Sequence, residues 1–152
     1  AMMEVTSAKG ESSGGDARLI VGGINITFSL PIAPIVAWDV SDLNSDGTDE
    51  IVVATRNGAL IILDERGRVI ASTVVANELY DFAVLQTSAG NKRILAATET
   101  DLRLFDTTLH SVGGSISAAG GCRRIEPIRT GESHRGLCLF RDGKAAVVSL
   151  LE

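Results

Sequence analysis

Short apolar runs separated by turn-forming residues make up most of the chain from residue 18 onward. The runs at residues 51–55, 59–63 and 94–98 are apolar at nearly every position and are rich in Val, Ile, Leu and Ala. Short runs of this kind, bounded by Gly, Asn or Asp, are typical of strands that are buried on both faces. The pattern therefore predicts an all-β fold of antiparallel strands joined by tight turns.

A sequence repeat relates these runs to one another. The first unit spans residues 51–64, the second spans 94–106, and a weaker third spans 136–148. The central turn residues of the three units are Asn57, Thr100 and Asp142. These turn residues lie 43 and 42 positions apart. A period of about 40–45 residues is that of four-stranded β-propeller blades, so each unit is interpreted as one blade.

Tight turns are expected inside and after each hairpin of these units. Asn57-Gly58 and Asp142-Gly143 match the two-residue type I′ turn, in which both central residues have a positive φ. Asp64 and Asp106 follow corresponding strands, and we expect their carboxylates to hold the next turn rather than to act in catalysis.

The chain divides into two regions. Residues 1–17 are rich in Ser, Gly, Glu and Lys and show no periodicity, which predicts a disordered leader. Residues 18–152 form the predicted β-propeller-like blade array, with about thirteen strands, or slightly more than three four-stranded antiparallel units. Such an array is an incomplete propeller, because a closed ring has about 4–8 blades. We expect a second copy or a partner chain to complete it; a closed barrel or compact sandwich is the alternative.

Composition and charge exclude several classes of protein. Of the 152 residues 45% are apolar but only 4% are aromatic, so aliphatic side chains must form the core. The net charge is −5, and no basic patch interleaved with aromatic residues occurs. We therefore expect no nucleic-acid partner. Since the chain has no apolar run of about 18 residues and no signal-peptide pattern, we expect no membrane insertion, and the compartment stays open.

The isolated cysteines and histidines do not form a recognisable site. Cys122 and Cys138 lie 16 positions apart in two neighbouring predicted strands. Two buried free thiols are the favoured interpretation, and a disulfide is the alternative. His110 and His134 have no second His or Cys at metal-binding spacing, so both are interpreted as ordinary surface or loop residues.

The acidic segment at residues 42–50 carries the strongest candidate site. Oxygen-bearing side chains stand at its positions 1, 3, 5 and 9, a glycine stands at position 6, and an apolar strand follows. Ca²⁺ takes six to eight oxygens at about 2.3–2.6 Å, and alternate oxygen side chains on a sharp turn supply most of them. Position 12 is Val53, which excludes an EF-hand. The alternative is a solvated Asp-Gly turn whose carboxylates cap local N–H groups.

Residues 34–70 resemble one blade of the FG-GAP and VCBS repeat family. The resemblance rests on the strand before the acidic loop, on the loop itself and on the hairpin around Asn57-Gly58. These repeats build β-propellers, among them integrin-α heads, secreted bacterial adhesins and lectins, and intracellular scaffold subunits. The resemblance implies one structural Ca²⁺ held by Asp42, Asn44, Asp46, the Thr48 carbonyl and Glu50. Because residues 88–92 and 130–134 of the other units lack this oxygen pattern, we expect one calcium site at most.

No catalytic group is predicted. The chain has no Gly-x-Ser-x-Gly nucleophile elbow, and Trp38 and Tyr80, at roughly matching places in their units, are interpreted as core aromatic residues. The predicted function is non-enzymatic protein–protein interaction or scaffolding, within a homo-oligomer or a larger complex. An extracellular glycan-binding adhesin or lectin module and a fragment of a propeller enzyme are the alternatives.

Overall fold

The computed structural model describes residues 3–11, 14–21, 24–30, 35–118, 121–131 and 133–150. Fourteen strands and no helix occur in these ranges. The described residues therefore contain no helix long and apolar enough to cross a membrane. The strands are β1 (Met3–Glu11), β2 (Gly14–Val21), β3 (Ile24–Leu30), β4 (Ile35–Ser41), β5 (Glu50–Thr55), β6 (Ala59–Leu63), β7 (Val69–Val74), β8 (Leu79–Gln86), β9 (Lys92–Thr98), β10 (Asp101–Phe105), β11 (Ile116–Ser117), β12 (Cys122–Thr130), β13 (Ser133–Phe140) and β14 (Ala145–Ser149).

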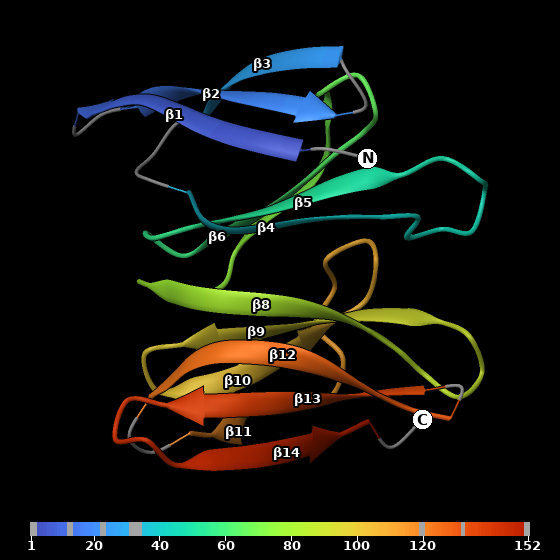
Figure 1. Cartoon of the computed structure of the whole chain (residues 1–152). Coiled ribbons are helices and arrows are strands. Elements are labelled where there is room, and N and C mark those ends of the chain that lie inside the picture. The colour runs from blue at the N-terminus through green and yellow to red at the C-terminus, as the bar shows by residue number, and fades with distance from the viewer. Residues whose placement is uncertain are drawn as a thin grey trace.

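The strands form four antiparallel sheets in which neighbours in sequence are also neighbours in space. Sheets β4–β7 and β8–β11 have four strands, and sheets β1–β3 and β12–β14 have three among the described residues. The sheets lie one after another in chain order, with β1–β3 at one end of the stack and β12–β14 at the other (Figure 1). The predicted all-β fold of antiparallel, blade-like units is confirmed.

Within the predicted leader at residues 1–17, the described residues 3–11 and 14–17 are strands. Met3–Glu11 forms β1, and β2 begins at Gly14. The two strands pair from Met3 opposite Val21 to Glu11 opposite Gly14. Because the hydrogen bonds of β1 are made to a neighbouring strand, a segment without a periodic pattern of its own can still be a strand.

Burial on both faces explains the apolar residues of β5 and β9. Val52 and Ala54 of β5 belong to the hydrophobic core between sheets β4–β7 and β8–β11. Leu95 and Ala97 of β9 belong to the core between sheets β8–β11 and β12–β14. Since alternate residues of a strand point to opposite faces, the remaining residues of β9 pack back into the preceding core. Sheet β8–β11 thus supplies side chains to two cores.

The first strands of three successive sheets share one register. β4, β8 and β12 contact one another in series. Each has a pairing irregularity near its start, where β8 accommodates Tyr80 and β12 accommodates Arg123 as an extra residue. The Arg123 guanidinium lies over the Tyr80 ring, 3.6 Å from its centroid. This cation–π contact joins β8 and β12 at their bulges.

Trp38 lies outside the core although the register aligns it with a buried residue. Counting from the bulges, Trp38 of β4 aligns with Phe82 of β8 and not with Tyr80. Phe82 is 5% exposed, whereas Trp38 is 40% exposed. The prediction that Trp38 is a core aromatic residue is therefore wrong.

Cys122 and Cys138 are free, buried thiols in the core between sheets β8–β11 and β12–β14. The hydrogen bond between the two sulfurs lowers the pKa of the Cys122 thiol and raises that of Cys138. The Cys122 thiol also lies 3.3 Å from the Arg124 carbonyl. The favoured interpretation of two free thiols is confirmed.

The repeated hairpin turns lie where the sequence period predicts them, but they are not type I′. The Gly58 N–H donates to the Thr55 carbonyl and the Gly143 N–H to the Phe140 carbonyl, each at 3.1 Å. Gly58 and Gly143 have φ values of 97° and 88°, while neither residue before them has a positive φ. Each loop is therefore a turn that ends on a left-handed glycine, the three-residue hairpin form.

Asp64 and Asp106 hold the turns that follow β6 and β10, as predicted. Asp64 Oδ1 accepts the N–H groups of Arg66 and Arg68, both at 2.9 Å. Asp106 Oδ1 accepts the N–H of Thr108 at 2.9 Å and that of His110 at 3.0 Å. The backbone hydrogen bond from Arg68 is the main cause of the lowered pKa of Asp64.

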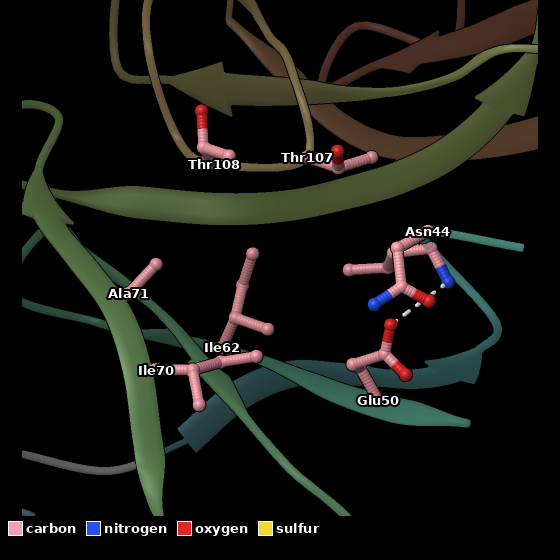
Figure 2. Close-up of a pocket in the computed structure, with 8 residues that line it drawn as sticks. Asn44, Glu50, Ile62, Ile70, Ala71, Thr107 and Thr108 are labelled. Atoms are coloured by element: carbon pink, nitrogen blue, oxygen red, sulfur yellow. Dashed lines mark hydrogen bonds between the residues drawn. The ribbon is translucent and has the colours of Figure 1, made fainter. Parts of the chain in front are cut away.

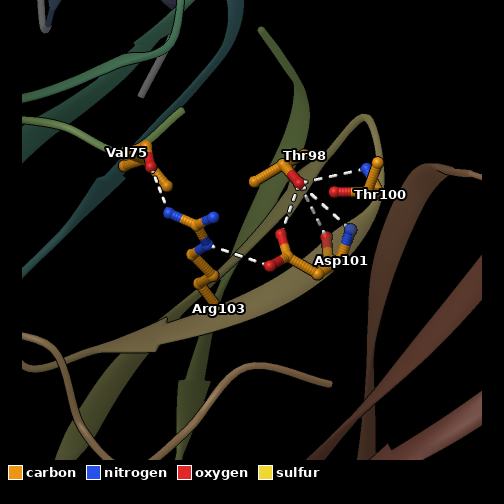
Figure 3. Close-up of polar contacts among 5 residues, drawn as sticks. All are labelled: Val75, Thr98, Thr100, Asp101 and Arg103. Atoms are coloured by element: carbon orange, nitrogen blue, oxygen red, sulfur yellow. Dashed lines mark hydrogen bonds and ion pairs between the residues drawn. The ribbon is translucent and has the colours of Figure 1, made fainter. Parts of the chain in front are cut away.

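Arg103 ties sheet β8–β11 to the segment that leaves β7 (Figure 3). Its guanidinium donates to the Val75 carbonyl and, at 3.1 Å, to Asp101 Oδ2. The Thr98 hydroxyl donates to Asp101 Oδ1, and its oxygen accepts the N–H groups of Thr100 and Asp101 at 3.2 and 3.1 Å. The turn between β9 and β10 is thereby fixed to the preceding sheet.

Removing the Asp81 carboxylate is expected to weaken the contact between β8 and β12. Asp81 Oδ2 accepts the Ile125 N–H at 2.8 Å, and burial raises the pKa of this carboxyl. In Asp81→Ala the Ile125 N–H loses its acceptor, which costs about 1–3 kcal/mol of unfolding free energy. Chemical denaturation measures the loss. As a control, Asp142→Ala removes an exposed turn carboxylate and should cost less; equal losses would contradict the assigned role.

Candidate metal centre

The acidic loop between β4 and β5 folds around its own carboxylates. Ser45 and Gly47 have φ values of 61° and 89°, and these left-handed residues reverse the chain. Asp42 Oδ2 accepts the Gly47 N–H at 2.9 Å, and Asp42 Oδ1 accepts the Asp46 N–H at 3.2 Å. The loop therefore closes back on its first residue.

Three of the five predicted ligand residues come together. Carboxylate oxygens of Asp42, Asp46 and Glu50 all lie within 4.8 Å of one another. Two ligands on opposite sides of one Ca²⁺ are up to about 5 Å apart, given oxygen distances of about 2.3–2.6 Å. The spacing and the hard oxygen donors thus fit a calcium ion.

Asn44 and Thr48 belong to the same loop but bond to Asp46. Asn44 Oδ1 accepts the Asp46 N–H at 3.2 Å. Asp46 Oδ1 accepts the Thr48 N–H at 2.8 Å and the Thr48 hydroxyl at 2.7 Å. The structure therefore places these two predicted ligands beside the carboxylate cluster, where they orient its exposed member.

The three carboxylates have different electrostatic environments. Burial is the main cause of the raised pKa of Glu50, and the neighbouring charge of Asp46 adds to it. The hydrogen bonds from Thr48 lower the pKa of Asp46. Glu50 also accepts the Leu43 N–H at 3.3 Å. An ionised, buried Glu50 beside two other carboxylates is the group that a bound cation would stabilise most.

Lys92, which the sequence analysis did not single out, links this loop to the next sheet. Its ammonium group donates to the Ser41 hydroxyl at 2.9 Å and to the Asp42 carbonyl at 2.8 Å. Lys92 is the first residue of β9, so the contact spans two sheets. The residue pattern gives no signal for this contact, because the two segments lie 50 residues apart in the chain, which is more than one repeat.

His134 makes the matching contact one sheet later. Its Nδ1 accepts the Gln86 N–H at 3.0 Å, which joins the start of β13 to the end of β8. Residues 88–92 and 130–134, which correspond to the acidic loop, thus serve as ordinary turns and inter-sheet contacts among the described residues. His110 is exposed and lies 2.7 Å from the Thr108 hydroxyl.

A cleft of about 220 Å³ lies beside the acidic loop, between sheets β4–β7 and β8–β11. Asn44 and Glu50 stand at one end of it and Ile62, Ile70 and Ala71 at the other, with Thr107 and Thr108 across from them (Figure 2). Glu50 therefore belongs both to the carboxylate cluster and to the lining of this cleft.

Comparison with known proteins identifies the fold. No protein family model matches the chain, and no curated protein is significantly similar to it in sequence. Two crystal structures of BBS1N in complex with ARL6DN, soaked with lead and with mercury, give TM-scores of 0.67 and 0.68 at 12% identity. They cover 96% of this chain, which spans 45% and 46% of theirs. A protein of unknown function from Bacteroides caccae gives a TM-score of 0.51 at 13% identity, over 90% of this chain and 51% of its own.

The chain thus spans about half the length of the propeller structures that it matches. At this level of identity the likeness concerns the fold. Together with the stacked antiparallel sheets, it shows that the chain is built of β-propeller blades and forms an incomplete propeller.

Proposed function

We propose that this chain is a non-enzymatic β-propeller module for protein–protein interaction or scaffolding, completed by a second copy or a partner chain. The observation that carries the proposal is the blade stack itself. Side-chain contacts such as those of Arg103, Lys92 and His134 hold the three sheets from β4 to β14 to one another, so this part of the stack offers a rigid surface. BBS1N, a structural neighbour, was crystallised with a protein partner, ARL6DN.

The proposal includes membership of the FG-GAP and VCBS repeat type and one structural calcium ion. Asp42, Asp46 and Glu50 would bind the ion, and Asn44 and Thr48 would complete or orient the ligand set. The ion would neutralise the clustered charge and fix the loop before β5. Its role is structural, since the carboxylates are held by hydrogen bonds within the loop.

Parallel binding screens test the interaction function. The purified chain is applied to a protein interaction array and to a glycan array, each in calcium and in chelator, and hits are repeated by calorimetry with purified components. The proposal predicts reproducible protein partners and no glycan ligand. Glycan binding without protein binding would contradict it and favour an adhesin or lectin module. Chemical conversion of a bound glycan or protein during these assays would favour a fragment of a propeller enzyme.

A further inference from the structure

We propose that the outer face of sheet β12–β14, which points away from sheet β8–β11, docks onto sheet β1–β3 of a second copy of this chain. Two identical contacts of this kind would close a ring of two copies. The inference rests on the proposed function as an incomplete propeller module, and it names the surface and the partner that complete it.

The pairing register defines the outer face. Leu137 lies opposite Val147, and Leu139 lies opposite Ala145. Ile128 of β12 lies on the same side, opposite Arg135. Directly paired residues of antiparallel strands point to the same face, so these apolar side chains share one face. Arg124, opposite Leu139, and Glu126, opposite Leu137, lie on this face too and form an ion pair, and Arg135 lies there opposite Ile128. Val147 is 54% exposed, and Ala145 is exposed as well.

The corresponding positions of the two preceding sheets are covered. Counted from the repeated hairpin turn, Leu137 and Leu139 correspond to Leu95 and Ala97 of β9, and to Val52 and Ala54 of β5. Leu95 and Ala97 are buried by sheet β12–β14, and Val52 and Ala54 are buried by sheet β8–β11. The apolar residues at this position face the next blade in both cases. In sheet β12–β14 no further sheet lies there among the described residues.

The opposite face of the same sheet is already packed as a blade. Cys138 and Ile125 are buried against sheet β8–β11. A Cβ added at Gly136 would come within 3.0 Å of Leu95 Cδ2, so the two sheets approach closely at this glycine. Strands β13 and β14 therefore have apolar residues on both faces, and among the described residues only the face toward sheet β8–β11 is covered.

The number of sheets favours a second copy as the occupant. One chain has four described sheets, so two copies have eight, which lies within the range of about 4–8 blades that close a propeller. Three copies would exceed that range. The chain also spans 45% of a matched propeller structure, so two copies approach its length. Sheet β1–β3 lies at the opposite end of the stack from β12–β14, as head-to-tail closure requires (Figure 1).

Sedimentation equilibrium tests the inference with the full chain. The wild type is expected at twice the monomer mass of 15.9 kDa. Leu137→Asp and Val147→Asp place a charge on the outer face, and each should weaken dimerisation at least about 100-fold, because an apolar contact would be replaced by a carboxylate that loses its water on docking. Val147→Asp replaces a largely exposed side chain, so its thermal unfolding as a monomer should stay cooperative. The matched control is Val74→Asp on β7, which is 73% exposed and lies away from this face.

Hydrogen exchange locates the contact. Amides of β1–β3 and of β12–β14 should exchange faster in Val147→Asp than in the wild type, whereas those of β9 should not change. A monomeric wild type, or a dimer that neither variant weakens, would overturn the inference. If a monomeric wild type still bound a protein in the screens and Leu137→Asp abolished that binding, the second copy would be excluded while the proposed function stood.

Discussion

Gly58→Ala is expected to destabilise the protein by at least about 4 kcal/mol and to disrupt sheet β4–β7. A Cβ at this position would lie 1.8 Å from the Ala76 carbonyl oxygen and 2.7 Å from its carbon. Both are backbone atoms, so no side-chain rotation can relieve the overlap. The φ of Gly58, 97°, adds strain for any L-residue. The Gly58 carbonyl also accepts the Val75 N–H at 2.7 Å, so a shift of the turn would break this contact.

Gly143→Ala is the matched control, because Gly143 ends the equivalent turn between β13 and β14. Its φ is 88°, but a Cβ there would have no atom within 4 Å. This variant should lose about 1 kcal/mol from backbone strain alone. Urea denaturation followed by circular dichroism compares the two. Equal losses would show that the close approach of Ala76 to Gly58 is not the cause.

Glu50→Gln is expected to abolish stabilisation by calcium while leaving the calcium-free protein at least as stable as the wild type. Saturating calcium, at about 100 times its dissociation constant, adds about 2.7 kcal/mol to the wild type. That corresponds to a rise in Tm on the order of 5–10 °C for a chain of this length. Gln keeps an oxygen for the Leu43 N–H but removes the buried charge. Asp46→Ala should likewise lose the calcium-dependent rise.

The pKa of Glu50 gives the sign of the pH dependence. Burial raises this pKa above its ordinary value of 4.5, so the folded chain binds the proton more tightly than the unfolded chain. In chelator, the wild type should therefore lose this contribution to stability as pH rises from 4.5 through the folded-state pKa, and Glu50→Gln should not. Calcium should offset the loss.

Asp49→Asn is the control for both calcium experiments. Asp49 is exposed, lies in the same loop and carries the same charge, but it is outside the carboxylate cluster. Melting curves in calcium and in chelator compare the wild type, Glu50→Gln and Asp49→Asn. Glu50→Gln retaining the full calcium-dependent rise, or Asp49→Asn losing it, would contradict the assigned ligand set.

The repeat period and the apolar runs predict much of the fold because each depends on neighbouring residues in the sequence. Val52 and Leu95 are apolar since both faces of their strands are buried, and the turns at Asn57 and Asp142 recur because every blade needs a hairpin at the same place. Gly47 and the alternate oxygens around it likewise identify the acidic loop. These features are visible in a single stretch of sequence.

The features that the sequence did not reveal depend on contacts between distant segments. The strand β1 is stabilised by β2, Lys92 reaches a loop of the preceding sheet, and the bulges at Val36 and Tyr80 align Trp38 with Phe82 instead of with Tyr80. The hairpin turns were assigned to the wrong type because an Asn-Gly or Asp-Gly pair also suits a turn that ends on a left-handed glycine. None of these outcomes follows from local spacing alone.

Small-angle X-ray scattering of the wild-type chain in calcium tests the central claim most directly, since it reports mass and shape together. A propeller closed by two copies is expected to have twice the monomer mass of 15.9 kDa and the profile of a flat, closed disc. A particle of monomer mass with the elongated profile of a single stack, unchanged with concentration, would contradict closure of the propeller by a second copy.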